Sequence, residues 1–397
     1  MKHRFIFFSI ILIDAIVLFF QTSELSISYP EAELLYGKFS FLQLIINTSL
    51  SFFGQNDFAL RLPMILFHLL SVILLNEISK KYIKVAKNRI WLVLLFILLP
   101  GVVSSSLIVN SAGLLIFGVF LFAYIYENFS IKFIYPLLMF YALIDAGFVY
   151  LFLGLIAYYL FNKDRNNFLY TLFLFLLSVY IYGFEAYGAP NGYFLDAIAV
   201  YSAVFSPIVF IYLFYALYRR YLTDKIDLEW YIVSTVLLVS LILSFRQRVS
   251  LEYFAPYLML GLPLAAQTFI SSYRVRLKNF RGGYKTIFTV SFVLLVLNTL
   301  VVFFNKELYL IIENPKKHFA YDMHVAKELA DQLKLKNINC VNTDKKYELR
   351  LKFYGISTCK EYLLTQNNFL DKKDSNVTIS YKDVVLYSAN VTKINNK

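Results

Sequence analysis

The sequence predicts an all-α polytopic membrane protein with about eleven transmembrane helices and a small C-terminal α+β soluble domain. Of its 397 residues, 59% are hydrophobic and only 16% are charged. The apolar residues form blocks of about fifteen to twenty, the length that crosses a bilayer as a helix. This pattern ends near residue 304, and the shorter patterns of a soluble domain follow. We therefore expect a transmembrane domain over 1–304 and a soluble domain over 305–397.

The first apolar block follows the basic start MKHR and resembles a signal peptide. We interpret it as an uncleaved first helix, because the segment QTSELSISYP that follows it is a poor cleavage site. Pro100-Gly101, Asn110-Ser111 and Asp145-Gly147 interrupt two later blocks, which we divide into shorter helices. The predicted spans lie near 4–21, 58–78, 91–107, 111–126, 133–145, 147–161, 168–182, 197–218, 230–245, 253–271 and 286–304.

Basic residues are unevenly distributed between the predicted loops. The net charge of +12 therefore indicates the loop bias that orients a membrane protein rather than a nucleic-acid partner. With a cytoplasmic N-terminus, the inner loops hold most Lys and Arg, and the C-terminal domain is periplasmic in a bacterial inner membrane. The outer segments of the first 304 residues carry only Lys38, Arg61, Arg246 and Arg248.

The C-terminal domain combines helical and strand patterns. The stretch YDMHVAKELADQLK has helical periodicity, INCVN predicts a short strand, and VTISYKDVVLYSANVTKI predicts a hairpin. Cys340 and Cys359 are the two cysteines of the chain. In a periplasmic domain they form either a disulfide or two buried thiols. The stretch DSNVT (374–378) also resembles an extended bacterial glycosylation sequon with Asn376 as its acceptor.

The long outer segment 22–57 contains the candidate catalytic residues Glu31 and Glu33 in YPEAELLYG. The apolar stretch 39–53 is too short to span a bilayer, and we expect it to lie along the membrane interface as an amphipathic helix. A carboxylate held there can act as a general base toward an acceptor hydroxyl or amine. The alternative is a pair of solvated loop charges, since most acidic side chains are exposed.

Arginines near the outer ends of the predicted helices are candidate contacts for a substrate phosphate. Arg61 lies at the mouth of the second span. Arg246 and Arg248 lie in SFRQRVSLEYF on the outer side, where basic residues are disfavoured. Guanidinium groups suit a phosphate or pyrophosphate at headgroup depth. The alternatives are snorkelling for Arg61, and a salt bridge to Glu252 or an interfacial anchor for the other pair. No nucleotide-binding fingerprint or catalytic triad spacing is present in the sequence.

The order of these features resembles the GT-C superfamily of membrane glycosyltransferases, in particular the group of protein O-mannosyltransferases and aminoarabinose lipid A transferases. The motif that best supports the resemblance is G-x-x-x-x-A-x-R-L-P, formed here by Gly54, Ala59, Arg61, Leu62 and Pro63. The resemblance implies a polyprenyl-phosphate-linked sugar donor and transfer on the outer face. It also implies that an acidic residue of the first loop is the base or a metal contact.

Two acidic positions of that family are changed here. Its Asp-Glu-Ala motif corresponds to Pro30-Glu31-Ala32, so Glu31 remains, with Glu33 as a nearby substitute. Its aspartate at the fourth helix falls near Asn110-Ser111, where no carboxylate stands. Either the site is rearranged around Glu31 and Glu33, or the protein is no longer an enzyme.

The sequence therefore predicts a glycosyltransferase with Glu31 and Glu33 as catalytic residues and Arg61, Arg246 and Arg248 as phosphate contacts. Its partners are the bilayer, the lipid-linked sugar donor and a glycan, lipid or protein acceptor, and the cofactor is either a divalent metal ion or none. Two rival functions stay open, a transporter or flippase of a lipid-linked glycan and a non-catalytic GT-C-like scaffold.

Overall fold

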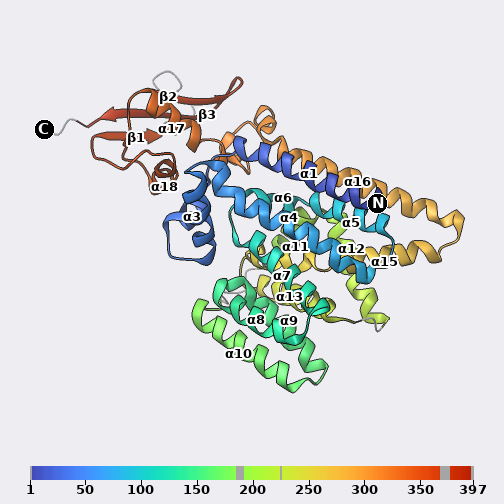
Figure 1. Ribbon diagram of the computed structural model, residues 1–397. Helices are drawn as coiled ribbons and strands as arrows, with labels where there is room; N and C mark the ends of the chain where they lie inside the picture. The colour runs from blue at the N-terminus through green and yellow to red at the C-terminus, as the bar shows by residue number, and fades with distance from the viewer. Residues whose placement is uncertain (1, 185–191, 224–225, 367–375, 395–397) are drawn as a thin grey trace. The chain divides into compact units, whose positions relative to one another are not determined.

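The computed structural model describes residues 2–184, 192–223, 226–366 and 376–394 and divides into two compact units. Unit 1 comprises Met1–Ile16 and Met64–Thr299, and unit 2 comprises Val17–Pro63 and Leu300–Lys397. The unit boundaries fall within or beside the long helices α1 (Lys2–Glu24), α4 (Asp57–Tyr82) and α16 (Arg281–Phe303) (Figure 1). Unit 2 thus joins the predicted outer loop to the predicted tail domain. The division into a transmembrane domain over 1–304 and a soluble domain over 305–397 stays a prediction.

Unit 1 is built from helices, most of them apolar. Besides the parts of α1, α4 and α16 that fall within it, they are α5 (Ala86–Ile97), α6 (Pro100–Leu107), α7 (Ser111–Asn128), α8 (Ile131–Ile144), η1 (Ala146–Phe148), α9 (Val149–Phe161), α10 (Arg165–Tyr182), α11 (Phe194–Phe205), α12 (Pro207–Leu222), α13 (Leu228–Ser244), α14 (Leu251–Met259), α15 (Leu262–Val275) and η2 (Lys278–Phe280).

Three predicted spans are bent pairs of helices. The axes of α5 and α6 differ by 62°, those of α11 and α12 by 105°, and those of α14 and α15 by 41°. A proline, Pro100, Pro207 or Pro263, stands in the first turn of the second helix of each pair. Proline suits that position but cannot continue a preceding helix, because it lacks the N–H that would donate to an earlier carbonyl. At the sharpest bend, Ser206 adopts a positive φ of 65°.

The predicted count of about eleven spans is not confirmed. Among the described residues, four helices are long and apolar enough to cross a membrane, or up to seven if each bent pair is one span. The four are α1, α4, α7 and the segment Lys278–Phe303, and shorter apolar helices include α8, α13 and Ala146–Phe161. The mostly helical class and the small C-terminal sheet are as predicted.

Unit 2 combines short helices with one antiparallel sheet. Its elements, besides its parts of α1, α4 and α16, are α2 (Tyr29–Tyr36), α3 (Phe41–Phe53), η3 (Asn305–Leu310), η4 (Pro315–Lys317), η5 (Tyr321–Met323), α17 (Ala326–Leu335), α18 (Lys345–Phe353), β1 (Tyr362–Gln366), β2 (Val377–Tyr381) and β3 (Val384–Lys393).

The sheet has the order β1-β3-β2. The predicted hairpin is present as β2 and β3, with Tyr381 opposite Val384 and a bulge between Ile379 and Ser380. Lys382 has a positive φ of 51° in the turn, as two-residue hairpin loops require. The predicted strand INCVN is replaced by isolated bridges from Cys340 to Ser357 and from Asn342 to Leu363.

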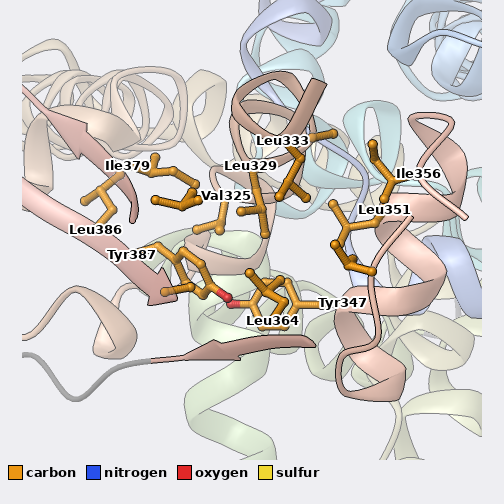
Figure 2. Packing of buried hydrophobic residues seen from close by; sticks show 14 of the residues in the cluster. Val325, Leu329, Leu333, Tyr347, Leu351, Ile356, Leu364, Ile379, Leu386 and Tyr387 are labelled. Carbon is orange, nitrogen blue, oxygen red and sulfur yellow. The ribbon is translucent and has the colours of Figure 1, made fainter. Parts of the chain in front are cut away.

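The core of unit 2 lies between α17, α18 and the sheet. Leu329 and Leu333 from α17 lie among side chains from β2, β3 and α18, including Ile379, Tyr387 and Leu351 (Figure 2). Each of these side chains is almost fully buried. Cys340 and Cys359 form a disulfide beside this core, with their Cα atoms 5.4 Å apart.

The predicted interface helix corresponds to α3. It buries Leu42, Ile46 and Ser49, whereas Phe52 and Phe53 are 77% and 57% exposed. The one-sided exposure of large apolar side chains fits a helix lying along a membrane surface. Its position at the interface stays a prediction.

Candidate functional site in the segment 22–57

Glu31 closes a capping box at the start of α2. Its carboxylate accepts hydrogen bonds from the backbone N–H of Ser28 at 2.8 Å and from the Ser28 hydroxyl at 2.9 Å. The Ser28 side chain in turn accepts from the backbone N–H of Glu31. A serine followed three residues later by glutamate is the sequence signature of this motif, with Pro30 in the first turn. One role of Glu31 is therefore to fix where α2 begins.

Arg61 is the second partner of Glu31. Both side chains are fully buried, and Nη2 of Arg61 lies 3.2 Å from Oε2 of Glu31. The same guanidinium donates to the backbone carbonyls of Leu25 and Ser26, each at 2.9 Å. Arg61 thus holds the segment before α2 against the first turns of α4. A fully buried guanidinium does not fit the alternative of a side chain that snorkels to an interface.

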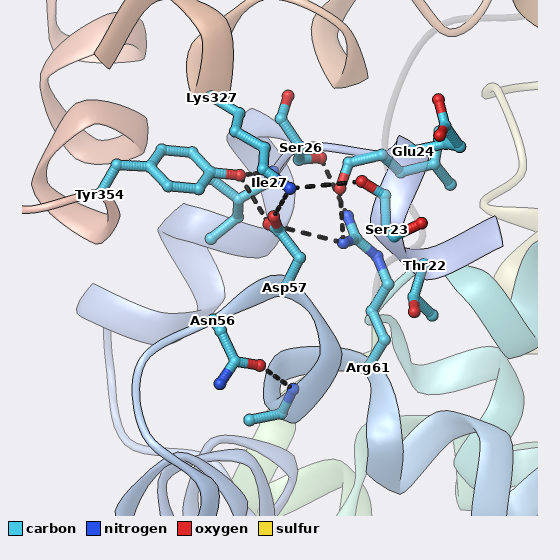
Figure 3. A network of polar contacts seen from close by, with 12 residues as sticks. Thr22, Ser23, Glu24, Ser26, Ile27, Asn56, Asp57, Arg61, Lys327 and Tyr354 are labelled. Atoms are coloured by element: carbon cyan, nitrogen blue, oxygen red, sulfur yellow. Dashed lines mark hydrogen bonds and ion pairs between the residues drawn. The ribbon is translucent and has the colours of Figure 1, made fainter. Parts of the chain in front are cut away.

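Asp57 extends this network to the C-terminal part of unit 2. Tyr354 donates its hydroxyl hydrogen to Asp57 at 2.6 Å, and Nζ of Lys327 lies 3.0 Å from the same carboxylate (Figure 3). The backbone N–H of Ile27 donates to the Tyr354 hydroxyl at 2.9 Å. Burial, with the nearby charge of Asp57, raises the pKa of Tyr354 and keeps its hydroxyl protonated. The segment 22–57 is therefore fixed to the tail by charged and polar contacts.

The family-like string 54–63 supplies much of this network. Gly54 adopts the left-handed region (φ 81°) after α3, and Asn56 accepts a hydrogen bond from the N–H of Ala59 at 2.7 Å. The carbonyl of Ala59 accepts from the Ser49 hydroxyl at 2.6 Å. The motif that carries the resemblance therefore stabilises the end of α3 and the start of α4.

Glu33 has a different environment from Glu31. Two residues apart on α2, their side chains point about 200° apart around the helix axis. Glu33 is exposed, and its carboxylate accepts from the Tyr29 hydroxyl at 3.2 Å. The two glutamates are therefore not brought together as a base and its helper.

A cavity of about 460 Å³ lies between α2, the helix that carries Glu33, and α3. Its lining includes the polar side chains of Tyr36, Asn47, Ser51 and Gln55. The amide of Gln55 donates to the Tyr36 hydroxyl at 3.2 Å. Hydroxyl, amide and aromatic groups of this kind suit a neutral polar ligand.

Arg246 and Arg248 belong to unit 1, between α13 and α14. Both side chains are exposed, and the guanidinium of Arg248 lies 5.5 Å from the centre of the Tyr193 ring. Glu31, Glu33 and Arg61 belong to unit 2. A shared pocket of all five residues stays a prediction.

The second altered family position lies in unit 1. Asn110 caps α7, and the neighbouring Ser111 donates its hydroxyl hydrogen to Asp145 at 2.7 Å. Asp145 also accepts from the N–H of Gly147 at 2.8 Å. A carboxylate from another helix end thus reaches the position where the sequence has none, a pairing across 34 residues that sequence reasoning missed. Another acidic side chain of unit 1, Asp14 on α1, has its carboxylate 2.7 Å from Nε2 of His68.

The remaining candidates are a metal site and a glycosylation site. Within the described ranges, no group of three or more His, Cys, Asp or Glu side chains is arranged to hold a metal ion. Asn376 directly precedes β2, and its side-chain amide donates to the carbonyl of Val391 at 3.3 Å. Asp374 and Ser375 of the sequon lie outside the described residues.

Comparisons with known proteins show the fold of this chain. No family model and no curated protein sequence matches it. Among solved structures, it is similar to ArnT from Cupriavidus metallidurans in the apo state, with a TM-score of 0.56, 11% identity and 97% of each chain covered. It is also similar to the same protein bound to undecaprenyl phosphate, with a TM-score of 0.55, 11% identity, 87% of this chain covered and 84% of the other. The fold that the predicted resemblance implies is thus confirmed.

Proposed function

We propose that this protein is an integral-membrane glycosyltransferase that moves a sugar from a polyprenyl-phosphate-type donor to a glycan, lipid or protein acceptor. The observation that carries the proposal is a fold shared over 97% of both chains with ArnT. One solved form of that protein holds undecaprenyl phosphate, a lipid carrier of the proposed kind. The apolar helices of unit 1 are consistent with a multi-pass protein of a bacterial inner membrane.

The proposed reaction needs no nucleotide. An acceptor hydroxyl oxygen attacks the anomeric carbon of the donor and forms the new glycosidic bond. The bond from that carbon to the phosphate oxygen breaks, and the phosphate leaves with the electron pair. A carboxylate accepts the proton of the hydroxyl, and cationic groups stabilise the charge that develops on the leaving phosphate.

The geometry divides the candidate residues into two groups. Glu31 and Arg61 are fully buried and bound to each other, so we assign them the positioning of the first outer loop. Glu33, Arg246 and Arg248 are exposed and can reach a bound molecule. We therefore propose Glu33 as the base and the two exposed arginines as the contacts for the carrier phosphate.

The cavity between α2 and α3 is a suitable place for the sugar or its acceptor. Its tyrosine, asparagine, serine and glutamine side chains offer hydrogen bonds to sugar hydroxyls. A divalent metal ion would supply further charge stabilisation to the leaving phosphate. Among the residues that the structure describes, no group of three or more His, Cys, Asp or Glu side chains is arranged to hold one, so the proposed reaction assigns no step to it.

Carrier binding tests the phosphate contacts. Purified full-length protein is titrated with undecaprenyl phosphate, alongside Arg246→Gln/Arg248→Gln and the matched control Arg165→Gln/Lys132→Gln, whose residues are also exposed. We expect the first pair to weaken binding by about tenfold or more, since each basic residue near an anionic lipid contributes about 1 kcal/mol. Binding that is equally strong in all three proteins would contradict the assignment of the arginines.

The non-catalytic scaffold is the second candidate, and one observation favours it. The carboxylate that the family resemblance places in the first loop, Glu31, is occupied by a helix cap and a buried arginine. A scaffold predicts carrier binding without any glycosidic bond formed. Glu33→Gln separates the two, because a scaffold does not need that carboxylate.

A further inference from the structure

Four helices of unit 1 enclose a groove that the proposed reaction does not use. It has a volume of about 530 Å³ and lies between α5, α12, α15 and the first half of α16. This volume is typical of pockets for small molecules. Its lining residues include Trp91, Tyr212, Phe269, Phe288, Arg274 and Lys285.

The walls of the groove are aromatic and aliphatic. Phe288 contacts both Trp91 and Phe269, with ring centres 5.7 Å and 5.8 Å apart, and Phe269 contacts Tyr212 at 5.7 Å. Leu92, Ile270 and Ile287 complete the apolar surface. A cavity with such walls favours a hydrocarbon chain over a polar ligand.

One group of lining residues is cationic. Arg274 lies in the last turn of α15, and Lys285 lies in the first turns of α16, so the α15–α16 connection brings both to the groove. The described lining contains no aspartate or glutamate. Two further cations at the same connection lie over aromatic rings. The guanidinium of Arg276 lies 4.5 Å from the centre of the Tyr284 ring, and that of Arg281 lies 5.4 Å from the centre of the Tyr273 ring. An apolar groove beside several cations fits a molecule with a hydrocarbon chain to place in the groove and an anionic head to place at the cations.

This basic end is far from the arginines that we assign to the carrier phosphate. Arg248 precedes α14 and Arg274 ends α15, so the two stand at opposite ends of one bent helix pair, Leu251–Val275. About 25 residues at 1.5 Å each give roughly 35 Å of helix, about the thickness of a bilayer's hydrocarbon core. The loops that surround Arg274 are those that the positive-inside rule places in the cytoplasm.

We propose that this groove binds an anionic phospholipid of the cytoplasmic leaflet, with an acyl chain between the aromatic walls and the phosphate at Arg274 and Lys285. The cytoplasmic leaflet supplies anionic lipid at the depth of these loops. The occupant is a phospholipid rather than the sugar carrier, whose phosphate we place at Arg246 and Arg248, and this choice of occupant rests on the proposed function. The transfer reaction itself does not use the groove.

Lipid binding to the full-length protein in detergent, measured by native mass spectrometry, tests the proposal. The probes are phosphatidylglycerol, phosphatidylcholine and undecaprenyl phosphate, each titrated separately. We expect phosphatidylglycerol to bind about fivefold or more tightly than phosphatidylcholine. Arg274→Gln/Lys285→Gln is expected to weaken phosphatidylglycerol binding by about tenfold or more, at about 1 kcal/mol for each charge.

The control variants separate this site from the proposed carrier site. Arg165→Gln/Lys132→Gln changes exposed basic residues elsewhere and should leave phosphatidylglycerol binding unchanged. Arg246→Gln/Arg248→Gln should also leave it unchanged, whatever its effect on undecaprenyl phosphate. Ala266→Phe, which places a ring in the groove, should weaken phosphatidylglycerol binding without removing a charge.

Three outcomes would overturn the proposal. The first is equal binding of the two phospholipids, and the second is undiminished phosphatidylglycerol binding by Arg274→Gln/Lys285→Gln. The third is competition between undecaprenyl phosphate and phosphatidylglycerol, together with loss of undecaprenyl phosphate binding in Arg274→Gln/Lys285→Gln. That outcome would make the groove a carrier site. A normal circular dichroism spectrum and unchanged elution from a sizing column confirm that each variant is folded.

Discussion

Arg61 and Glu31 are both fully buried and lie 3.2 Å apart, although 30 residues separate them in the sequence. Each also binds the segment that precedes α2, Glu31 through Ser28 and Arg61 through the carbonyls of Leu25 and Ser26. The pair therefore determines the path of the segment 22–57. This makes the two residues a poor choice for testing catalysis, because their loss disturbs the loop itself.

Removing one partner of the pair should destabilise unit 2 strongly. Glu31→Ala removes the nearer of the two carboxylates beside the buried Arg61 guanidinium, while Asp57, 3.8 Å away, remains. Breaking a buried pair costs about 3–5 kcal/mol when nothing else compensates the charge, so we expect a cost toward the lower end of that range and a matching fall in the protection of α2 amides against hydrogen exchange. Glu31→Ala/Arg61→Met should cost less than the two single changes added together, since the guanidinium and its nearer partner are removed together. Glu33→Ala is the control, and simple additivity of the pair would contradict direct coupling.

Tyr354 should be required for docking the loop to the tail. Tyr354→Phe removes the donor to Asp57 and the acceptor for the N–H of Ile27. Buried groups left without partners cost about 1–3 kcal/mol each. We expect faster hydrogen exchange in peptides covering 22–30, with little change in the sheet. Tyr362→Phe, in β1, is the matched control, and an equal effect of both changes would argue against the specific contact.

The tail should lose stability at mildly acidic pH because of His324. This side chain is 4% exposed, and its Nδ1 lies 2.9 Å from the Tyr309 hydroxyl. Burial lowers the pKa of His324 to about 3, with contributions from Lys306 and His318, against an ordinary value of 6.5. Below pH 6.5, His324 of the unfolded chain therefore binds a proton, whereas His324 of the folded chain stays neutral until the pH approaches about 3. Stability is full above pH 6.5 and falls by up to about 1.4 kcal/mol per unit below it.

Protection factors of α17 amides, corrected for the intrinsic effect of pH, measure this loss between pH 7 and 5. His324→Asn retains a hydrogen-bonding group beside the Tyr309 hydroxyl but does not titrate, so its stability should change less with pH. His318 also has a pKa lowered by burial and contributes to the remaining slope. A wild-type protection that does not change across this range would contradict the prediction.

The disulfide between Cys340 and Cys359 should stabilise the tail. It closes a loop of 19 residues, for which the chain-entropy model gives about 3 kcal/mol. Cys340→Ser/Cys359→Ser should lower the protection of β1 and α18 amides by a comparable amount. In cells, the two thiols should resist alkylation until a reductant is added, as expected for a periplasmic domain. Rapid alkylation without reductant would contradict that location.

Several features could be predicted from the sequence because they depend on local patterns. The hairpin of β2 and β3 follows from strand alternation around a turn, and α3 follows from the apolar stretch 39–53. The capping box is also a local pattern, because a serine followed three residues later by a glutamate, as in Ser28 and Glu31, marks the start of a helix.

Other features depend on contacts that no local pattern contains. The pairing of Arg61 with Glu31, and that of Ser111 with Asp145, join residues about thirty positions apart. The 105° bend at Ser206 lies inside one continuous apolar block. A hydropathy pattern records length and composition but not direction, so a bent pair of helices looks like one span.

The most direct test of the proposed function is the mass profile of lipid carriers and surface glycans from cells with the wild-type gene, a deletion, Glu33→Gln or the control Glu313→Gln. Glu33 and Glu313 are both exposed, and all proteins are expressed at equal level. We predict that the deletion and Glu33→Gln lose the same sugar-sized mass from one glycan and accumulate the sugar-loaded carrier, while Glu313→Gln matches the wild type. Unchanged glycans and carriers in the deletion strain would contradict the account of this protein as a glycosyltransferase. A loss in the deletion alone would remove Glu33 as the base.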